Sequence, residues 1–137
     1  MPELIYTGGC LCKAVRYEAR GVPLYRAVCH CDSCRRATGG AMVPWATFND
    51  ARFKVTHGQM TEFASSAQVL RGFCARCGSA LTYRHEGRAG EVDITTCTLD
   101  GPAALVPAMH VFVQDKLPYV QLADGLPQFD TLPDGGS

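Results

Sequence analysis

The stretches Cys10-Leu11-Cys12, Cys29-His30-Cys31-Asp32-Ser33-Cys34 and Cys74-Ala75-Arg76-Cys77 hold seven of the chain's eight cysteines. Seven divides into four and three, and this division indicates two metal sites. Two short cysteine pairs can close a tetrahedral zinc site with four thiolates, whereas three cysteines can hold zinc and leave a fourth position open to a reactant. The open position is therefore where we expect chemistry.

The length of 137 residues suits one domain with a substantial core. We expect a single zinc-binding domain over residues 1–137, with residues from about 125 to 137 forming an extended C-terminal tail. Lys and Arg number 13 and Asp and Glu also number 13, so the charge balance gives no footprint for nucleic acid. There is no signal-like start and no apolar run long enough to span a bilayer. We therefore expect a cytoplasmic protein with no nucleic-acid or membrane partner.

A disulfide framework is the main alternative for eight cysteines. A reducing cytosol disfavours structural disulfides and leaves thiolates available to metal. A bridge within Cys10/Cys12 or Cys29/Cys31 would also be strained, because near neighbours on one face of a strand lack suitable disulfide geometry. The spacing therefore favours metal over disulfides.

Alternating apolar residues predict strands over most of the chain. One strand face is expected to carry Leu11, Val15 and Tyr17, and the next to carry Tyr25, Ala27, Cys29 and Cys31. Further strands are expected at 51–56, 61–64, 68–73, 80–84, 91–99 and 110–113. Turn residues separate them and helical periodicity is scarce, so we expect an all-β fold. It would be a small antiparallel β-sandwich or barrel-like zinc fold with at most short helical turns.

One short helix is expected from Asp32 or Ser33 to Thr38, because an N-cap residue opens it and Gly39-Gly40 ends it. Pro44 lacks a backbone N–H, so the segment around it is expected to be an edge or irregular strand. Residues 124–137 are expected to begin as a packed extended segment and to end in a frayed tail.

Cys10 and Cys12 can bind one metal ion if they lie on a strand, because side chains at i and i+2 point to the same face. Cys74-x-x-Cys77-Gly78 is typical of a knuckle turn, in which glycine allows the tight backbone. Joining the two pairs would link the chain start to its middle. Structural zinc contributes about 10–16 kcal/mol of apparent binding free energy to folding, so losing this site is expected to unfold the domain.

The cluster of Cys29, Cys31 and Cys34 offers one ligand fewer. Cys34 is expected at a turn or helix start, where a helix N-terminus favours the thiolate. Three thiolates leave a Zn²⁺ centre with one net negative charge, which suits a soft fourth ligand such as an incoming thiolate. The alternative is an inert site in which His30, Cys97 or a distant group is the fourth ligand. Alternation points His30 away from the cluster, and Cys97 is expected to be a buried, inert thiol.

Three segments carry a family resemblance: Gly8-Gly9-Cys10-x-Cys12-x-Ala14-Val15-Arg16-Tyr17-Glu18, Cys29-His30-Cys31-x-x-Cys34-Arg35-Arg36-Ala37-Thr38-Gly39 and Phe73-Cys74-x-x-Cys77-Gly78. They resemble the glutathione-dependent formaldehyde-activating enzyme family, which includes centromere protein V. Lys13 stands where many members of this family carry glycine, so the first turn is expected to differ locally.

The resemblance implies a small all-β fold with two zinc ions, a structural one on Cys10, Cys12, Cys74 and Cys77 and a catalytic one on Cys29, Cys31 and Cys34. The implied activity is that of a carbon–sulfur lyase resembling S-(hydroxymethyl)glutathione synthase. Glutathione or another small thiol would add to formaldehyde or another small carbonyl. A non-catalytic zinc scaffold that binds a partner is the alternative within this family. A zinc deaminase is disfavoured, because its H-x-E and P-C-x-x-C signatures are absent.

Five further side chains are weaker candidates for substrate contacts. Arg35 and Arg36 follow Cys34 and can bind a carboxylate, with a solvated helix surface as the alternative. Trp45, Phe48 and His110 can line a pocket, but core packing is the favoured interpretation for the aromatic residues and a satisfied strand histidine for His110.

Overall fold

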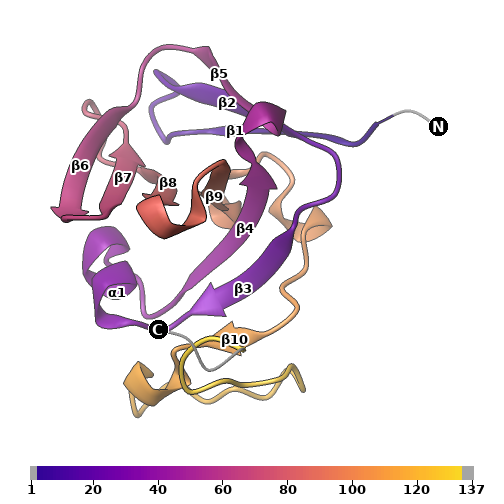
Figure 1. Cartoon of the computed structure of the whole chain (residues 1–137), viewed down its shortest axis with the longest axis vertical. Coiled ribbons are helices and arrows are strands. Elements are labelled where there is room, and N and C mark those ends of the chain that lie inside the picture. Colours follow the sequence, from indigo (N-terminus) through magenta and orange to yellow (C-terminus); the bar gives the residue numbers. More distant parts are fainter. Residues whose placement is uncertain (1–2, 134–137) are drawn as a thin grey trace.

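The computed structural model describes residues 3–133, which form two β-sheets and one short α-helix (Figure 1). The small sheet has the strand order β1-β2-β5, and the large sheet has the order β10-β3-β4-β9-β8-β7-β6. The strands are β1 (Ile5–Gly9), β2 (Arg16–Arg20), β3 (Tyr25–Cys29), β4 (Val43–Asn49), β5 (Phe53–His57), β6 (Thr61–Ser66), β7 (Val69–Phe73), β8 (Ala80–His85), β9 (Glu91–Thr95) and β10 (His110–Val111). The helix is α1 (Asp32–Thr38), and short 3-10 segments are η1 (Asp50–Arg52), η2 (Glu86–Arg88), η3 (Thr96–Thr98), η4 (Pro102–Ala104) and η5 (Val113–Asp115).

The predicted all-β class with only short helical elements is confirmed. Neighbouring strands pair antiparallel except β10, which pairs parallel with β3. Within residues 3–133 no helix is long and apolar enough to cross a membrane.

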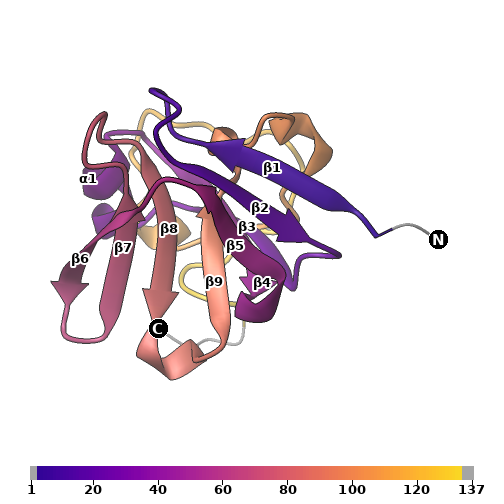
Figure 2. The same ribbon diagram turned by 90° about the horizontal axis from the view of Figure 1, so that it is seen from above.

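The two faces of the large sheet carry different chemistry, because side chains alternate along each strand. One face presents Ala46 and Phe48 of β4, paired with Ile94 and Val92 of β9, and this face packs on Tyr17 and Ala19 of the small sheet. The opposite face carries Trp45 of β4 and packs against Cys34 of helix α1. Figures 1 and 2 show the small sheet on one side of the large sheet and α1 away from it. The main core therefore lies between the sheets, and a second apolar cluster lies under the helix.

Helix α1 occupies the predicted residues. Its N-cap is Cys31, whose sulfur accepts a hydrogen bond from the Cys34 N–H, and not Asp32 or Ser33. Gly39 ends the helix in the left-handed conformation, with φ 75°, as expected for a helix C-terminus. The helix follows directly after β3, so it carries Cys34 back toward the end of that strand.

The strand expected to carry Leu11, Val15 and Tyr17 on one face is interrupted. Strand β1 ends at Gly9 and β2 begins at Arg16, and the residues between them form a hairpin loop. In this loop the Lys13 N–H donates to the Cys10 carbonyl at 3.1 Å. Lys13 adopts φ 69°, a left-handed conformation that glycine usually adopts. Because the residue is a lysine, the sequence did not indicate this turn. Cys10 and Cys12 therefore lie in a tight loop and not on a strand.

Pro44 lies inside the large sheet, so the expectation of an edge or irregular strand was wrong. Strand β4 pairs with β3 on one side and β9 on the other. The Val28 N–H opposite Pro44 donates away from it to the Met109 carbonyl, so the two residues form a non-hydrogen-bonded pair. The nitrogen of Pro44, which carries no hydrogen, thus faces β9, and β4 pairs with β9 only from Trp45 onward. The proline removes no ladder hydrogen bond.

The strand expected at 91–99 ends at Thr95, where the chain turns into η3. The Thr98 hydroxyl donates to the Thr95 carbonyl at 2.7 Å and also lies 2.7 Å from the Tyr17 hydroxyl. This turn places Cys97 on the surface. The interpretation of Cys97 as a buried thiol was therefore wrong.

The C-terminal segment packs along β10, as expected for its first part. The His110 N–H donates to the Pro127 carbonyl and the Phe129 N–H donates to the His110 carbonyl, both at 2.9 Å. The end of the expected frayed tail, residues 134–137, lies outside the described residues.

We expect Gly58→Ala to destabilise the protein, because Gly58 has φ 72° and an added Cβ would collide with the Ala14 carbonyl oxygen in the β1–β2 loop. The cost should be about 1–3 kcal/mol in the free energy of unfolding, measured with urea. Gly101→Ala is the control, because nothing lies within 4 Å of an added Cβ there. Equal stability of the two variants would contradict the packing of this loop.

Candidate metal centres and their surroundings

The first cysteine cluster joins the two sheets. The sulfurs of Cys10, Cys12, Cys74 and Cys77 all lie within 4.8 Å of one another. Cys12 lies 3.7 Å from both Cys10 and Cys74, measured sulfur to sulfur. Four sulfurs about 2.3 Å from a tetrahedral zinc ion would be separated by nearly that distance. The donor set and its spacing therefore fit zinc, although the first pair comes from a hairpin loop.

The Cys74–Gly78 turn has the geometry expected of a knuckle. The Gly78 N–H donates to the Cys74 carbonyl at 2.7 Å, and Gly78 itself has φ 80°. Ser79 contacts both halves of the cluster, because its hydroxyl lies 3.2 Å from the Cys77 sulfur and accepts the Leu11 N–H at 3.0 Å. Hydrogen bonds from the Ser79 hydroxyl and backbone lower the pKa of Cys77 to about 5, which favours the thiolate form that binds metal.

The second cluster lies at the junction of β3 and α1. Cys29 is the last residue of β3, Cys31 is the N-cap of α1, and Cys34 lies in the first turn of the helix. Their three sulfurs lie within 4.8 Å of one another. The expectation that Cys29 and Cys31 share a strand face was wrong, because β3 ends at Cys29. The bend into the helix, rather than strand alternation, brings the sulfurs together.

Contacts between the sulfurs shift the pKa values of this cluster in opposite directions. The pKa of Cys31 lies far below its usual value, first because of contacts with the Cys29 and Cys34 thiols and further because of the charge of Arg71. The contact with Cys31 raises the pKa of Cys29. The arrangement thus favours the thiolate form of Cys31, while the pKa values of Cys29 and Cys34 are raised. Such a cluster is chemically suited to a soft divalent ion.

Neither residue considered as a fourth ligand reaches this cluster. In the described part of the chain the second group contains three cysteines and no further His, Cys, Asp or Glu ligand atom. His30 is fully buried and contacts His110, and Cys97 is exposed in η3. Residues 3–133 thus supply three ligands and leave one position of a tetrahedron without a protein donor.

A buried chain of histidines holds the segment between Cys29 and Cys31. His30 Nε2 lies 2.9 Å from His110 Nδ1, and His110 Nε2 lies 2.7 Å from Asp124 Oδ2. The Asp124 carboxylate accepts a hydrogen bond from His110 Nε2–H, and in that tautomer His110 Nδ1 accepts a hydrogen bond from His30 Nε2–H. The buried Nδ1 of His30 then carries only a lone pair, which fits its lack of a partner among the described residues. His110 is therefore a satisfied histidine, as predicted.

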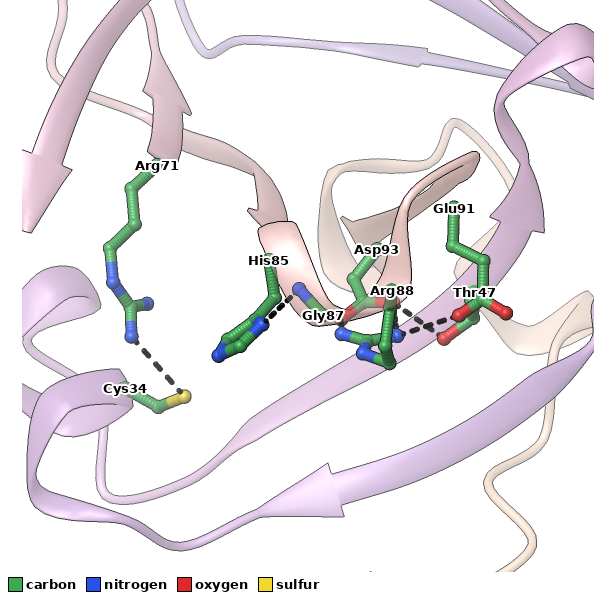
Figure 3. A network of polar contacts seen from close by, with 8 residues as sticks. All are labelled: Cys34, Thr47, Arg71, His85, Gly87, Arg88, Glu91 and Asp93. Atoms are coloured by element: carbon green, nitrogen blue, oxygen red, sulfur yellow. Dashed lines mark hydrogen bonds and ion pairs between the residues drawn. The ribbon is translucent and has the colours of Figure 1, made fainter. Parts of the chain in front are cut away.

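A row of polar side chains crosses the large sheet on the face of the second cluster, and sequence reasoning missed it. Arg71 pairs with Tyr83, Tyr83 pairs with Asp93, and Asp93 pairs with Thr47, each on neighbouring strands. Asp93 is nearly buried and accepts from the Thr47 hydroxyl at 2.5 Å and from Arg88 at 2.6 Å (Figure 3). These residues lie far apart in the sequence, so only the strand register reveals the row.

The Arg71 end of this row reaches the second cluster. Its Nη2 lies 4.0 Å from the Cys34 sulfur, and Figure 3 shows the side chain extending toward Cys34. Arg35 instead donates to the His30 carbonyl, and exposed Arg36 pairs with Asp32 at 3.1 Å. The two arginines singled out from the sequence are thus already engaged around the helix.

The aromatic candidates have packing roles. Trp45 is buried against Tyr83, with ring centroids 5.9 Å apart, and Phe48 is buried in the core between the sheets. The favoured interpretation from sequence, core packing, agrees with both positions. Trp45 also lies in the apolar cluster that contains Cys29 and Cys34, so it forms part of the wall beside the sulfurs.

The fold and the two sulfur clusters define a small, mostly β protein with the donor sets of two metal centres. Residues 5–115 match the family described as glutathione-dependent formaldehyde-activating enzyme. The chain belongs to this family, which confirms the resemblance noted in its sequence.

Two relatives are similar to this chain in sequence, and one solved structure shares its fold. An uncharacterized lyase of Schizosaccharomyces pombe is 26% identical over 116 residues, which span 85% of this chain and 82% of the relative. A Halomonas elongata protein, provisionally named as a glutathione-dependent formaldehyde-activating enzyme, is 32% identical over 88 residues, or 57% of this chain and 55% of its own. A crystal structure of a Rhodobacter sphaeroides protein shares the fold, with a TM-score of 0.58 at 21% identity over 90% of this chain and 98% of that one.

We expect zinc analysis to give two ions per chain in the wild type and one in Cys34→Ser, because the clusters do not share ligands. Cys74→Ser should lose the fold, since its cluster links the two sheets. Cys97→Ser is the matched control and should keep both ions, because Cys97 is exposed and belongs to neither cluster. Loss of an ion from Cys97→Ser would contradict this ligand assignment.

Proposed function

We propose that the protein is a zinc-dependent carbon–sulfur lyase that adds a small thiol to a small carbonyl compound. Glutathione and formaldehyde, which give S-(hydroxymethyl)glutathione, are the proposed substrates. Membership of the glutathione-dependent formaldehyde-activating enzyme family and the lyase-named relative support this class of reaction. The observation that carries the proposal is the cluster of Cys29, Cys31 and Cys34, to which no described residue adds a fourth ligand.

In this proposal the two clusters have different roles. Cys10, Cys12, Cys74 and Cys77 hold a structural zinc ion, whose four ligands are all supplied by the chain. Cys29, Cys31 and Cys34 hold a catalytic one. Zinc bound there would lower the pKa of an incoming thiol and polarise a carbonyl oxygen. The reaction forms one carbon–sulfur bond, while the thiol loses its proton and the former carbonyl oxygen gains one.

The chain's own residues prepare this position. Cys34 lies in the first turn of α1, and the Cys31 sulfur accepts its N–H at 3.3 Å, which fixes two of the ligands relative to each other. Trp45 and Val43 pack beside the sulfurs and exclude water from one side of them. Arg71 brings positive charge to a centre that gains negative charge when a thiolate arrives. These contacts position the sulfurs and balance charge at the reacting atoms.

We also propose that the protein acts in the cytoplasm, where reduced thiols are abundant. Seven cysteines lie in the two groups suited to metal, and metal binding requires the reduced thiols that a reducing compartment maintains. A cytoplasmic location would supply both the zinc-binding thiolates and a thiol substrate.

We expect the zinc-loaded wild type to accelerate formaldehyde consumption by glutathione above the uncatalysed background. Cys34→Ser should fall to the background, because it removes a ligand of the second cluster. Cys97→Ser should retain the wild-type rate. A protein that binds two zinc ions but accelerates the reaction of no small thiol would instead be a zinc scaffold.

A further inference from the structure

Arg71 is held rigidly at the edge of the second cluster. It lies on β7 opposite Tyr83, and its guanidinium carbon is 4.9 Å from the centre of the Tyr83 ring. Its Nε donates to the Ser65 hydroxyl at 3.3 Å, while Nη2 lies 4.0 Å from the Cys34 sulfur. Stacking on one face and a hydrogen bond at Nε leave the outer edge of the guanidinium fixed in direction. Little side-chain entropy remains to be lost when that edge binds a ligand.

The charge of Arg71 has no carboxylate partner within residues 3–133. Most other arginines form ion pairs: Arg16 with Asp100, Arg20 with Glu18, Arg35 and Arg36 with Asp32, Arg52 with Glu3, Arg84 with Asp50, and Arg88 with Glu91 and Asp93. Arg88 contacts the same Tyr83 ring, yet Asp93 and Glu91 neutralise it. Within this polar row, the charge of Arg71 thus remains available to an anion from outside residues 3–133.

The position of Arg71 sets how far an anion that it binds can lie from the reacting sulfur. The three cysteine sulfurs lie within 4.8 Å of one another, so an atom in the fourth position of their tetrahedron lies close to all of them. The Arg71 guanidinium lies beside one of these sulfurs. A carboxylate carried a few bonds from a thiol in that position can therefore reach the guanidinium. Guanidinium matches carboxylate in a two-point fork, which a neutral or cationic group cannot reproduce.

We propose that Arg71 determines substrate choice by binding a carboxylate of the incoming thiol. The protein then prefers small thiols that carry a carboxylate over neutral or cationic thiols of the same length. This inference rests on the proposed function, because it places the thiol at the second metal centre. Arg71 acts here as a specificity-determining residue and not as a metal ligand.

The test compares three thiols of the same length that differ only in their distal group: 3-mercaptopropionate, 3-mercaptopropanol and 3-aminopropanethiol. Isothermal titration calorimetry of the zinc-loaded wild type should show 3-mercaptopropionate binding about tenfold tighter than the alcohol, equivalent to about 1.4 kcal/mol. 3-Aminopropanethiol should bind most weakly, because its ammonium group is repelled by Arg71. This series tests the inference in the wild type, without any variant.

Variants then assign the preference to a residue. Arg71→Gln should reduce the difference between acid and alcohol to within about twofold, and Arg71→Lys should keep an intermediate difference, because lysine retains charge but loses the fork. Arg36→Gln is the control and should leave the wild-type ratio unchanged, since Arg36 is exposed and paired with Asp32. Zinc content and circular dichroism of each variant establish that the fold and both metals are retained.

Three results would overturn the inference in different ways. If none of the thiols binds the zinc-loaded wild type, the proposed function itself is wrong. If all three thiols bind equally and Arg71→Gln changes nothing, the proposed function stands and the role of Arg71 is wrong. If Arg36→Gln abolishes the preference, the carboxylate is bound at the helix and not at Arg71.

Discussion

Four thiol groups lie together where the two sheets meet, and much of the structure depends on this contact. Cys10 and Cys12 lie in the hairpin loop of the small sheet, and Cys74 and Cys77 lie in the turn between two strands of the large sheet. A metal ion bound by all four would cross-link segments more than 60 residues apart, since the Cys12–Cys74 contact spans 62 positions. Such a link removes conformational freedom from the unfolded chain and complements a core of modest size.

The second cluster is separated from the first by the large sheet itself. Alternation along β4 and β9 sends apolar side chains toward the small sheet and sends Trp45, Thr47 and Asp93 to the other face. The three remaining clustered cysteines lie on that other face, at the junction of β3 and α1. One sheet thus separates the four-sulfur cluster from the three-sulfur cluster.

Arg71 brings positive charge to the second cluster. A centre of three thiolates and one divalent ion carries net negative charge, and an incoming thiolate adds more. Asp93 neutralises Arg88, whereas Arg71 is left facing the Cys34 sulfur. The histidine pair beside Cys29 and Cys31 is buried, and its contact supports the backbone of the segment between these two cysteines. Arg71 thus offsets part of the negative charge that gathers at this cluster.

The sequence was sufficient to predict the features that depend on local spacing. Cysteine spacing predicted which sulfurs meet, and Gly39 predicted where α1 ends, although the N-cap is Cys31 and not Asp32 or Ser33. Features set by long-range pairing or unusual backbone could not be predicted. The turn at Lys13 was not predicted, because a lysine there adopts a conformation typical of glycine. Pro44 is tolerated in the sheet because pairing between β4 and β9 begins at the next residue, Trp45. Arg71 became a candidate only when strand register placed it beside Tyr83 and Cys34.

The chain is expected to supply four sulfurs to one zinc ion and three to the other. X-ray absorption at the zinc edge tests this directly in protein loaded with two zinc ions. We expect sulfur at about 2.3 Å together with a light-atom ligand at about 2.0–2.2 Å, which disappears when 3-mercaptopropionate is added. Coordination by sulfur alone before the thiol is added, or a light-atom ligand that persists afterwards, would rule out this division of ligands.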